Sequence, residues 1–120
     1  MKIGIVGCTG RMGRMLVQTV VNTEGAELAG GTERETSPFI GQDPAVVAGE
    51  VPSGALITAN ADDLFVKADA VIDFTAPAAT IEHAKLAAKH GTGLVIGSTG
   101  LSGDDQAIIN EAAKSTTIIQ

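Results

Sequence analysis

Short apolar runs rich in β-branched residues alternate with helical patterns along this chain. The first run, KIGIVG at residues 2–7, meets glycines spaced by three, Gly7, Gly10 and Gly13. Residues 12–23 then carry apolar side chains at helical spacing, which predicts a helix directly after the glycines. A strand, a tight turn and a helix in this order are typical of a βαβ unit, and such units build parallel sheets.

The alternation continues to the end of the sequence. Further strands are expected at residues 27–32, 55–58, 69–74, 93–96 and 116–120, and further helices at residues 62–68, 78–90 and 104–114. Asn60 or Asp62 is expected to cap the first of these helices, Gly91 to end the second and Ser102 to cap the third. The segment 35–54 contains several prolines and glycines and is expected to be mostly loop. The predicted fold class is α/β, a doubly wound parallel sheet with helices on both faces.

The composition limits the classes of function. A chain of 120 residues with 44% hydrophobic and 18% charged residues is expected to form one globular domain. The net charge of −6 and an aromatic content of 2% argue against nucleic-acid binding, which uses basic surfaces or stacking side chains. Cys8 is the only cysteine, so we expect no intramolecular disulfide and a reducing, cytoplasmic location. No apolar stretch is long enough to span a bilayer, and no membrane contact is expected.

The glycine run is similar to a phosphate-binding turn. Gly10 and Gly13 have the spacing of the second and third glycines of Gly-x-Gly-x-x-Gly, whereas Gly7 lies one residue earlier than that pattern asks. We expect Gly7 to permit the turn off the strand, Gly10 to let a diphosphate approach the backbone, and Gly13 to let the helix pack on the sheet. The amides at the helix start then face the diphosphate. The alternative is a tight turn that binds no ligand.

An acidic residue strengthens the case for a dinucleotide. Glu33 lies twenty residues after Gly13, at the end of the second predicted strand, where a carboxylate can accept hydrogen bonds from adenosine ribose hydroxyls. The alternative is an exposed acid at a strand end. Glu33 favours NADH because it repels a 2′-phosphate, whereas Arg34 can bind that phosphate or lie over the adenine. The expected cofactor is therefore NADH or NADPH.

Two further loops are expected at the same sheet edge. Phe74, Thr75 and Ala76 follow the buried-strand pattern at 69–74, and the turn Gly97–Gly100 follows the strand at 93–96. The carboxyl ends of parallel strands share one edge, and ligands of open α/β sheets bind there. Together with the glycine loop, the two turns predict a cleft.

The remaining polar residues give weaker signals. Arg11 can reach a phosphate from the glycine loop, whereas Arg14 is expected to be a solvated helix residue. His83 and His90 lie two turns apart on one predicted helix and are expected at the surface. Asp73 is expected to be a buried or capping acid, with a catalytic role as the alternative. No Cys/His cluster suits zinc, so no metal site is expected, and no base accompanies Cys8 to make it a nucleophile.

Four segments together resemble the N-terminal domain of the 4-hydroxy-tetrahydrodipicolinate reductase (dihydrodipicolinate reductase) family. They are GIVGCTGRMGRML, GGTERE, VIDFTAPAATIEHAKLAAKHG and LVIGSTGLS. The resemblance runs through nearly the whole chain and implies a Rossmann-like fold and NAD(P)H-dependent reduction in the diaminopimelate route to lysine. It also implies cofactor-binding residues in four segments: Gly7, Cys8, Thr9, Gly10, Arg11, Met12, Glu33, Arg34, Phe74, Thr75, Gly97, Ser98 and Thr99.

The resemblance places other functions outside this chain. The family's catalytic residues, most of its substrate-binding groups and its homotetramer contacts belong to a C-terminal domain, so no catalytic residue is assigned in residues 1–120. The apolar strand pattern at 116–120 stops without a polar tail or a covering helix, and we expect a piece of a longer protein. The alternative is an edge strand that completes a small domain. Two other functions stay open: a stand-alone nucleotide-sensing regulatory domain, and the first half of another dehydrogenase.

Overall fold

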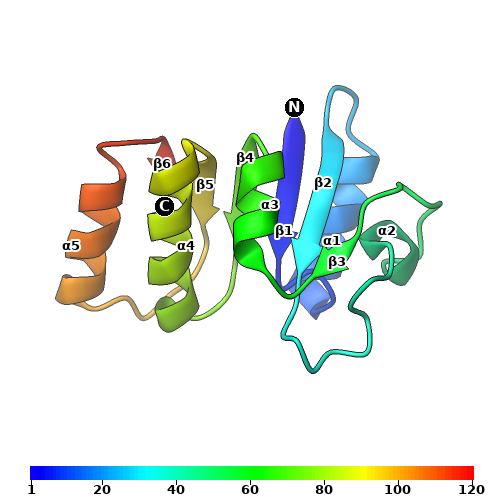
Figure 1. Ribbon diagram of the computed structural model, residues 1–120, viewed down its shortest axis with the longest axis horizontal. Coiled ribbons are helices and arrows are strands. Elements are labelled where there is room, and N and C mark those ends of the chain that lie inside the picture. The colour runs from blue at the N-terminus through cyan, green and yellow to red at the C-terminus, as the bar shows by residue number, and fades with distance from the viewer.

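The computed structural model describes residues 1–120, which form a six-stranded parallel sheet in the order β3-β2-β1-β4-β5-β6 (Figure 1). The strands are β1 (Lys2–Val6), β2 (Glu27–Thr32), β3 (Ile57–Thr58), β4 (Ala70–Asp73), β5 (Gly93–Ile96) and β6 (Ile118–Ile119). β2 and β3 lie on one side of β1, and β4, β5 and β6 lie on its other side, so the strand order reverses between β1 and β4. Open α/β sheets bind ligands at such a switch point.

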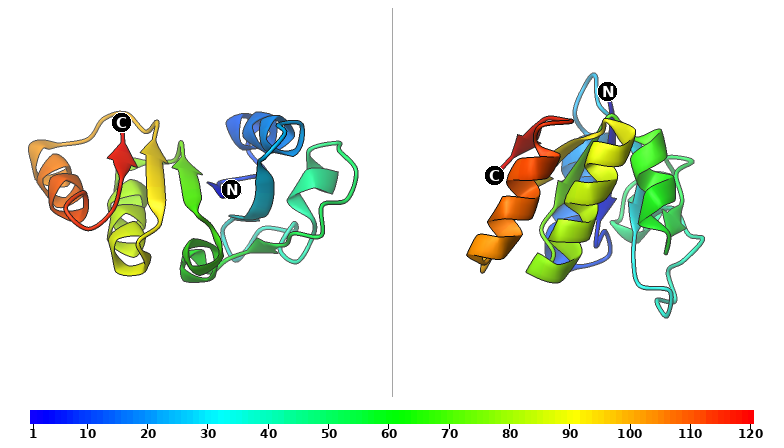
Figure 2. Two further views of the ribbon diagram at one scale, coloured as in Figure 1. Left: turned by 90° about the horizontal axis from the view of Figure 1, so that it is seen from above. Right: turned by 60° about the vertical axis from the view of Figure 1, so that its left-hand side comes forward.

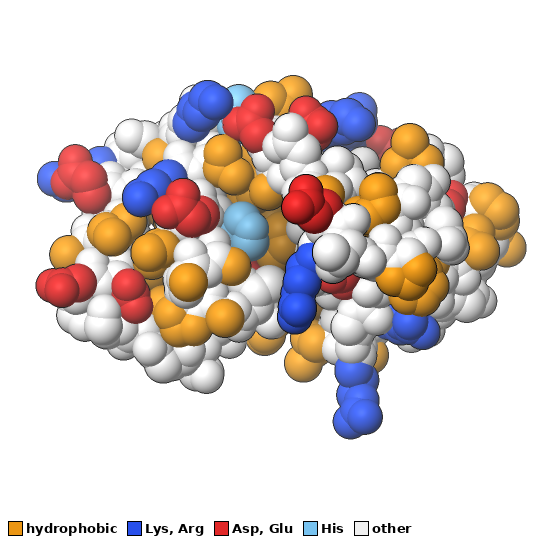
Figure 3. All heavy atoms as spheres, turned by 60° about the horizontal axis from the view of Figure 1, so that its bottom comes forward, with side chains coloured by type: hydrophobic (Ala, Val, Ile, Leu, Met, Phe, Trp, Pro, Cys, Tyr) orange, Lys and Arg blue, Asp and Glu red, His pale blue; other side chains and the backbone are white.

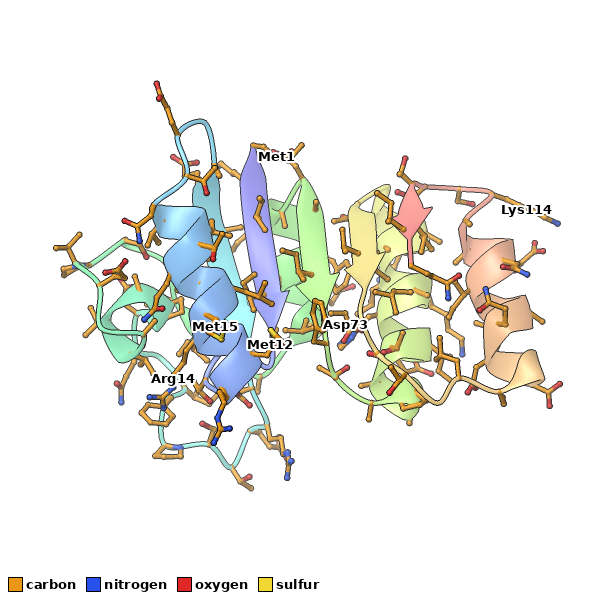
Figure 4. The ribbon with its side chains drawn as sticks, turned by 180° about the vertical axis from the view of Figure 1, so that it is seen from behind. Met1, Met12, Arg14, Met15, Asp73 and Lys114 are labelled. Atoms are coloured by element: carbon orange, nitrogen blue, oxygen red, sulfur yellow. The ribbon has the colours of Figure 1, made fainter.

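Helices lie on both faces of the sheet. They are α1 (Arg11–Val21), α2 (Pro44–Val47), α3 (Ala61–Lys67), α4 (Pro77–His90) and α5 (Gly103–Ala112). α1 and α2 cover one face beside β1 and β2, and α3, α4 and α5 cover the other (Figure 2). Viewed from behind, β4, β5 and β6 have no helix over them on the α1 face (Figure 4). The predicted doubly wound architecture is confirmed.

Each face has its own aliphatic core. Ile5, Cys8, Val17, Val20 and Leu28 are buried between the sheet and α1. On the other face a larger cluster joins three helices to β1, β4 and β5: Val6, Leu64, Phe65, Ala68, Val71, Ala84, Ala87, Leu94, Ile96, Ile109 and Ala112. Adjacent residues of β1 therefore enter different cores, as the alternation of strand side chains requires. Burying apolar surface on both faces is what stabilises a parallel sheet.

Strand register aligns the carboxyl ends at one edge. Val6 pairs with Thr32 on one side and with Asp73 on the other, and Asp73 pairs with Ile96. The residues that follow these four therefore leave the sheet side by side. This is why four loops distant in sequence meet at one edge of the sheet.

Most predicted elements are confirmed, and the structure adds one short helix. The strands at 27–32 and 93–96 have the predicted bounds, Asn60 and Ser102 cap their helices, and Gly91 ends α4 with φ 68°. The segment 35–54 is mostly loop, as predicted, but it also contains the four-residue helix α2. Its proline favours a helix start, since Asp43 accepts a hydrogen bond from Ala45 N as N-cap and a proline at N1 needs no N–H partner. None of the helices combines the length and the hydrophobicity needed to cross a membrane.

Candidate functional site

A cleft of about 530 Å³ opens at the carboxyl edge of the sheet. Its lining residues are Val6, Gly7, Thr32, Glu33, Arg34, Ala59, Ala61, Thr75, Ala76, Ala79 and His83. They come from the ends of β1 to β4 and from α3 and α4, so the cleft lies at the switch point of the sheet. Figure 3 shows this edge hollowed near its centre, with a histidine and apolar side chains inside the hollow and acidic and basic side chains around it.

The glycine loop turns from β1 into α1 as the sequence predicts. Gly7 has φ 67°, a conformation that favours glycine. Gly13 allows α1 to pack against the loop, because a Cβ there would lie 2.7 Å from Cys8 Cα. Gly7 N and Cys8 N both donate to Thr32 O, at 3.0 and 3.2 Å, so the loop is attached to the end of β2. The loop is therefore held in place by the protein alone.

The first turn of α1 has hydrogen-bond donors that nothing in the chain uses. Its N-cap, Gly10, has no side chain to accept from them, and the helix carries no acidic residue in its first turn. The amides of Arg11, Met12 and Gly13 accordingly have no acceptor in the chain. Together with the helix dipole, they make this terminus suited to an anion.

The N-termini of α3 and α5 differ from that of α1, whereas the N-terminus of α4 is similar to it. α3 has an Asn60 cap and α5 has a Ser102 capping box, and each also carries two aspartates in its first turn. α4 resembles α1, because its N-cap Ala76 makes no side-chain cap and its first turn has no acid. Ala76 lines the cleft. Uncapped, acid-free helix starts therefore occur beside the candidate site, where a ligand anion can replace the missing acceptor.

Glu33 reaches back from the end of β2 to the glycine loop. Its Oε2 accepts hydrogen bonds from Thr9 N, at 2.9 Å, and from Thr9 Oγ1, at 2.5 Å. No hydrogen bond in the chain reaches its Oε1, and Glu33 lines the cleft. Arg14 also braces this loop: its Nε donates to Thr9 O at 2.8 Å, and its guanidinium lies over the Phe39 ring at 5.7 Å. Arg14 is thus the exposed helix residue that the sequence predicts, and its contacts with the loop are an addition to that prediction.

A buried acid and a histidine lie on the β4–α4 side of the cleft. Asp73 is fully buried; its Oδ1 accepts from Thr75 N at 2.9 Å and from Thr75 Oγ1, and its Oδ2 lies 2.9 Å from His83 Nδ1. Burial alone raises the pKa of Asp73, but hydrogen bonds from His83 and Thr75 outweigh it and hold this pKa below its ordinary value. Asp73 is thus the buried acid that the sequence predicts, and Figure 4 shows it at the end of β4.

The prediction of surface histidines is wrong. The side chain of His83 is only 12% exposed, and its ring stacks on Phe65 with centroids 5.8 Å apart. His90 is 18% exposed and its Nε2 lies 2.8 Å from Asp62 Oδ1. Their spacing places them on the inward side of α4, where each reaches an aspartate on a neighbouring element. No group of three or more His, Cys, Asp or Glu side chains is placed to hold a metal ion.

The other predicted site residues lie around the cleft rather than in its lining. Gly10, Arg11 and Met12 are exposed at the start of α1. The Cys8 side chain is turned into the core beneath Gly31, and burial, with the nearby Glu33 charge, raises its pKa to about 12. This position removes the Cys8 thiol from any ligand contact and leaves only its backbone at the loop.

The loop after β5 lies beside the loop after β4. Phe74 is 44% exposed and its ring packs against Gly97, so neither belongs to the cleft lining. Ser98 is attached to α4, because its Oγ lies 2.7 Å from Oγ1 of the buried Thr80. Thr99 is exposed. Gly7, Glu33, Arg34 and Thr75 are thus the predicted residues that the cleft itself brings together.

Sequence reasoning missed Thr80 and His83 as site residues. Both lie on the first two turns of α4, on the side that faces the strand ends. The available signal was their spacing of three, which places a hydroxyl and an imidazole on one face near the start of a helix that follows a strand. Ala59, Ala61 and Ala79 also line the cleft and carry no polar signal.

This fold and this site define a class. A parallel sheet in the order 3-2-1-4-5-6, with a glycine loop at the switch point and an acid after β2, is a Rossmann-type nucleotide-binding domain. Within that class, residues 1–120 match the family described as dihydrodipicolinate reductase, N-terminus, and the chain belongs to this family.

Individual relatives agree with this assignment. The chain is 45% identical over 120 residues to the 4-hydroxy-tetrahydrodipicolinate reductase of Rhizobium meliloti (strain 1021), covering 100% of this chain and 44% of that protein. It therefore spans less than half the length of that relative. The dipicolinate-bound dihydrodipicolinate reductase from Paenisporosarcina sp. TG-14 superposes with a TM-score of 0.74 at 26% identity, covering 94% of this chain and 43% of that one. The family assignment favours a reductase over the regulatory alternative.

A more distant enzyme shares the fold alone. The WlbA dehydrogenase from Bordetella pertussis, in complex with NADH and UDP-GlcNAcA, superposes with a TM-score of 0.72 at 20% identity. The superposition covers 98% of this chain and 35% of that one.

Proposed function

We propose that residues 1–120 are the NADH- or NADPH-binding domain of a 4-hydroxy-tetrahydrodipicolinate reductase. The observation that carries the proposal is that unpaired backbone donors and an unpaired carboxylate acceptor lie at the same sheet edge. The amides at the start of α1 lack acceptors, and Glu33 Oε1 lacks a donor. A dinucleotide offers both complements, since its diphosphate accepts hydrogen bonds and its ribose hydroxyls donate them.

Each loop has a role in this proposal. Gly7 to Met12 cradle the diphosphate, the free amides of Arg11 and Met12 donate to it, and Gly10 leaves room for it because it has no side chain. Glu33 accepts from the adenosine ribose, and Arg34 meets its 2′ substituent. Thr75 borders the cleft, Phe74 supports Gly97, and Gly97, Ser98 and Thr99 lie by the nicotinamide end. The bound cofactor supplies a hydride, and this chain orients the ring that carries it.

The whole protein extends the proposal beyond these residues. The reaction is hydride transfer to a cyclic dicarboxylate substrate in the diaminopimelate route to lysine. The dipicolinate ligand of the Paenisporosarcina relative supports this substrate class. Groups outside residues 1–120 bind the substrate, protonate it and build a homotetramer. The location is cytoplasmic, which agrees with an unpaired Cys8 thiol.

Titration of the 120-residue chain with NADH and with NADPH by calorimetry tests the proposal. We expect saturable binding of at least one cofactor at concentrations below about 1 mM. Glu33→Ala is expected to weaken NADH more than NADPH, because the ribose hydroxyl loses its acceptor and the 2′-phosphate loses a repelling charge. Glu35→Ala is the matched control, since Glu35 is exposed and lies outside the cleft lining. Absence of saturable binding by both cofactors would refute the cofactor site.

A further inference from the structure

Thr9 has an unusual position for a residue of a phosphate-binding loop. Its N–H and its Oγ1–H both donate to Glu33 Oε2, and its carbonyl accepts from Arg14 Nε at 2.8 Å. Every polar group of Thr9 is therefore used inside the protein. A diphosphate that took the Thr9 amide would have to break the contact with Glu33.

The same contacts leave the two oxygens of the Glu33 carboxylate with different hydrogen bonding. Oε2 receives two donors from Thr9, whereas Oε1 receives none and belongs to a side chain that lines the cleft. Hydrogen bonds to a charged group are stronger than neutral ones and restrict its orientation. With Oε2 held by Thr9, the carboxylate cannot rotate away from the cleft without losing both bonds.

We propose that Thr9 is a positioning residue that sets the preference between NADH and NADPH by holding Glu33 at the ribose end of the cleft. The inference rests on the proposed function and adds a determinant of its cofactor preference. A fixed carboxylate presents one acceptor to a 2′-hydroxyl and a fixed negative charge to a 2′-phosphate. A carboxylate released from Thr9 no longer presents a fixed acceptor to a 2′-hydroxyl. It can also move away from a 2′-phosphate, which reduces the repulsion between the two charges.

Thr9→Val tests this role because it keeps the shape of the side chain and removes the hydroxyl donor. We expect the Kd for NADH to rise about tenfold, the scale of a hydrogen bond to a charged group, and the Kd for NADPH to change less than about threefold. The ratio of the two constants therefore shifts toward NADPH. A purely structural defect would weaken both cofactors together and leave this ratio unchanged.

Three companion variants isolate the hydroxyl. Thr9→Ser keeps the donor and is expected to restore the wild-type ratio to within about twofold. Thr19→Val makes the same substitution on the exposed side of α1, where Thr19 Oγ1 bonds only to Met15 O, and should leave the ratio unchanged. Glu33→Asp keeps the charge but shortens the side chain, so it cannot reach both Thr9 and the cleft. It is expected to shift the ratio in the same direction as Thr9→Val.

The outcomes separate the inference from the proposed function. If the unchanged chain binds neither cofactor, the proposed function fails. If it binds them and Thr9→Val does not shift the ratio, the role of Thr9 is overturned while the cofactor site stands. If Thr9→Val does not fold, which a thermal melt reveals, Thr9→Ala, which also lacks the hydroxyl, takes its place in this comparison.

Discussion

Thr80 Oγ1 and Ser98 Oγ lie 2.7 Å apart and join the buried side of α4 to the loop after β5. Thr80 is fully buried, and Ser98 is the polar residue nearest the core in a turn that otherwise consists of Gly97, Thr99 and Gly100. Three residues further along α4, His83 contacts Asp73. The first turns of α4 therefore hold both the loop proposed for the nicotinamide and a wall of the cleft.

Replacing Thr80 by Val is expected to loosen the loop at residues 97–100. The variant leaves the Ser98 hydroxyl without its partner, so the free energy of unfolding should fall by about 1 kcal/mol. NADH affinity should fall about fivefold, because the loop must then be ordered on binding. Calorimetric titration and urea denaturation measure the two effects.

Thr92→Val is the matched control for that variant. Thr92 is also buried, and its Oγ1 donates to Phe65 O at 2.6 Å, away from the loop after β5. It should lose comparable stability and keep wild-type NADH affinity. Equal loss of affinity in both variants would show that Thr80 acts only through overall stability.

Gly13→Ala is expected to destabilise the fold even though alanine favours helices. Its Cβ would lie 2.7 Å from Cys8 Cα and closer still to the Gly7 carbonyl oxygen, and both are backbone atoms that cannot rotate away. Overpacking of this kind costs about 1–3 kcal/mol, more than the gain of about 1 kcal/mol in helix propensity. Urea denaturation should show a net loss, and cofactor affinity should fall with it because the loop moves.

Gly103→Ala makes the same change at the start of α5, where a Cβ meets no atom within 4 Å. Its free energy of unfolding should stay the same or rise by about 0.5 kcal/mol, because the unfolded chain has less conformational freedom. A Gly13→Ala variant as stable as Gly103→Ala would contradict the close packing of α1 against the loop.

The parts of this fold that the sequence predicts are those with a local cause. β5 follows directly from its β-branched, glycine-bounded run, and Gly13 follows from the spacing of the loop. α2 was missed because Pro44 was interpreted as a breaker, although Asp43-Pro44 is a helix-start pattern when the aspartate faces the Ala45 amide.

The candidate site likewise has a part that the sequence predicts and a part that it does not. The alternation of strands and helices along the chain predicts that Gly7, Glu33 and Thr75 meet at one edge of the sheet, and they do. The bonds from Thr9 to Glu33 and from His83 to Asp73 depend instead on side-chain conformations across 24 and 10 residues of sequence. Local patterns carry no information about such contacts, and so His83 was assigned to the surface.

Asp73 links the cleft to the pH dependence of stability. Its hydrogen bonds from His83 and Thr75 outweigh burial and hold its pKa in the folded state below the ordinary value of 3.8. The unfolded chain therefore binds a proton at a higher pH than the folded chain does. The stability that Asp73 contributes is present above pH 3.8 and is lost as the pH falls through its lower, folded-state pKa.

Asp73→Asn should accordingly lower stability near neutral pH and flatten its fall in acid. We expect urea denaturation at about pH 5 and about pH 3 to give a smaller difference in unfolding free energy for Asp73→Asn than for the unchanged chain. Asp104→Asn is the control, because Asp104 is exposed in the first turn of α5 and its side chain forms no hydrogen bond. It should reproduce the wild-type difference. If Asp73→Asn also shows the wild-type difference between the two pH values, then the contacts with His83 and Thr75 do not stabilise the charged form of Asp73.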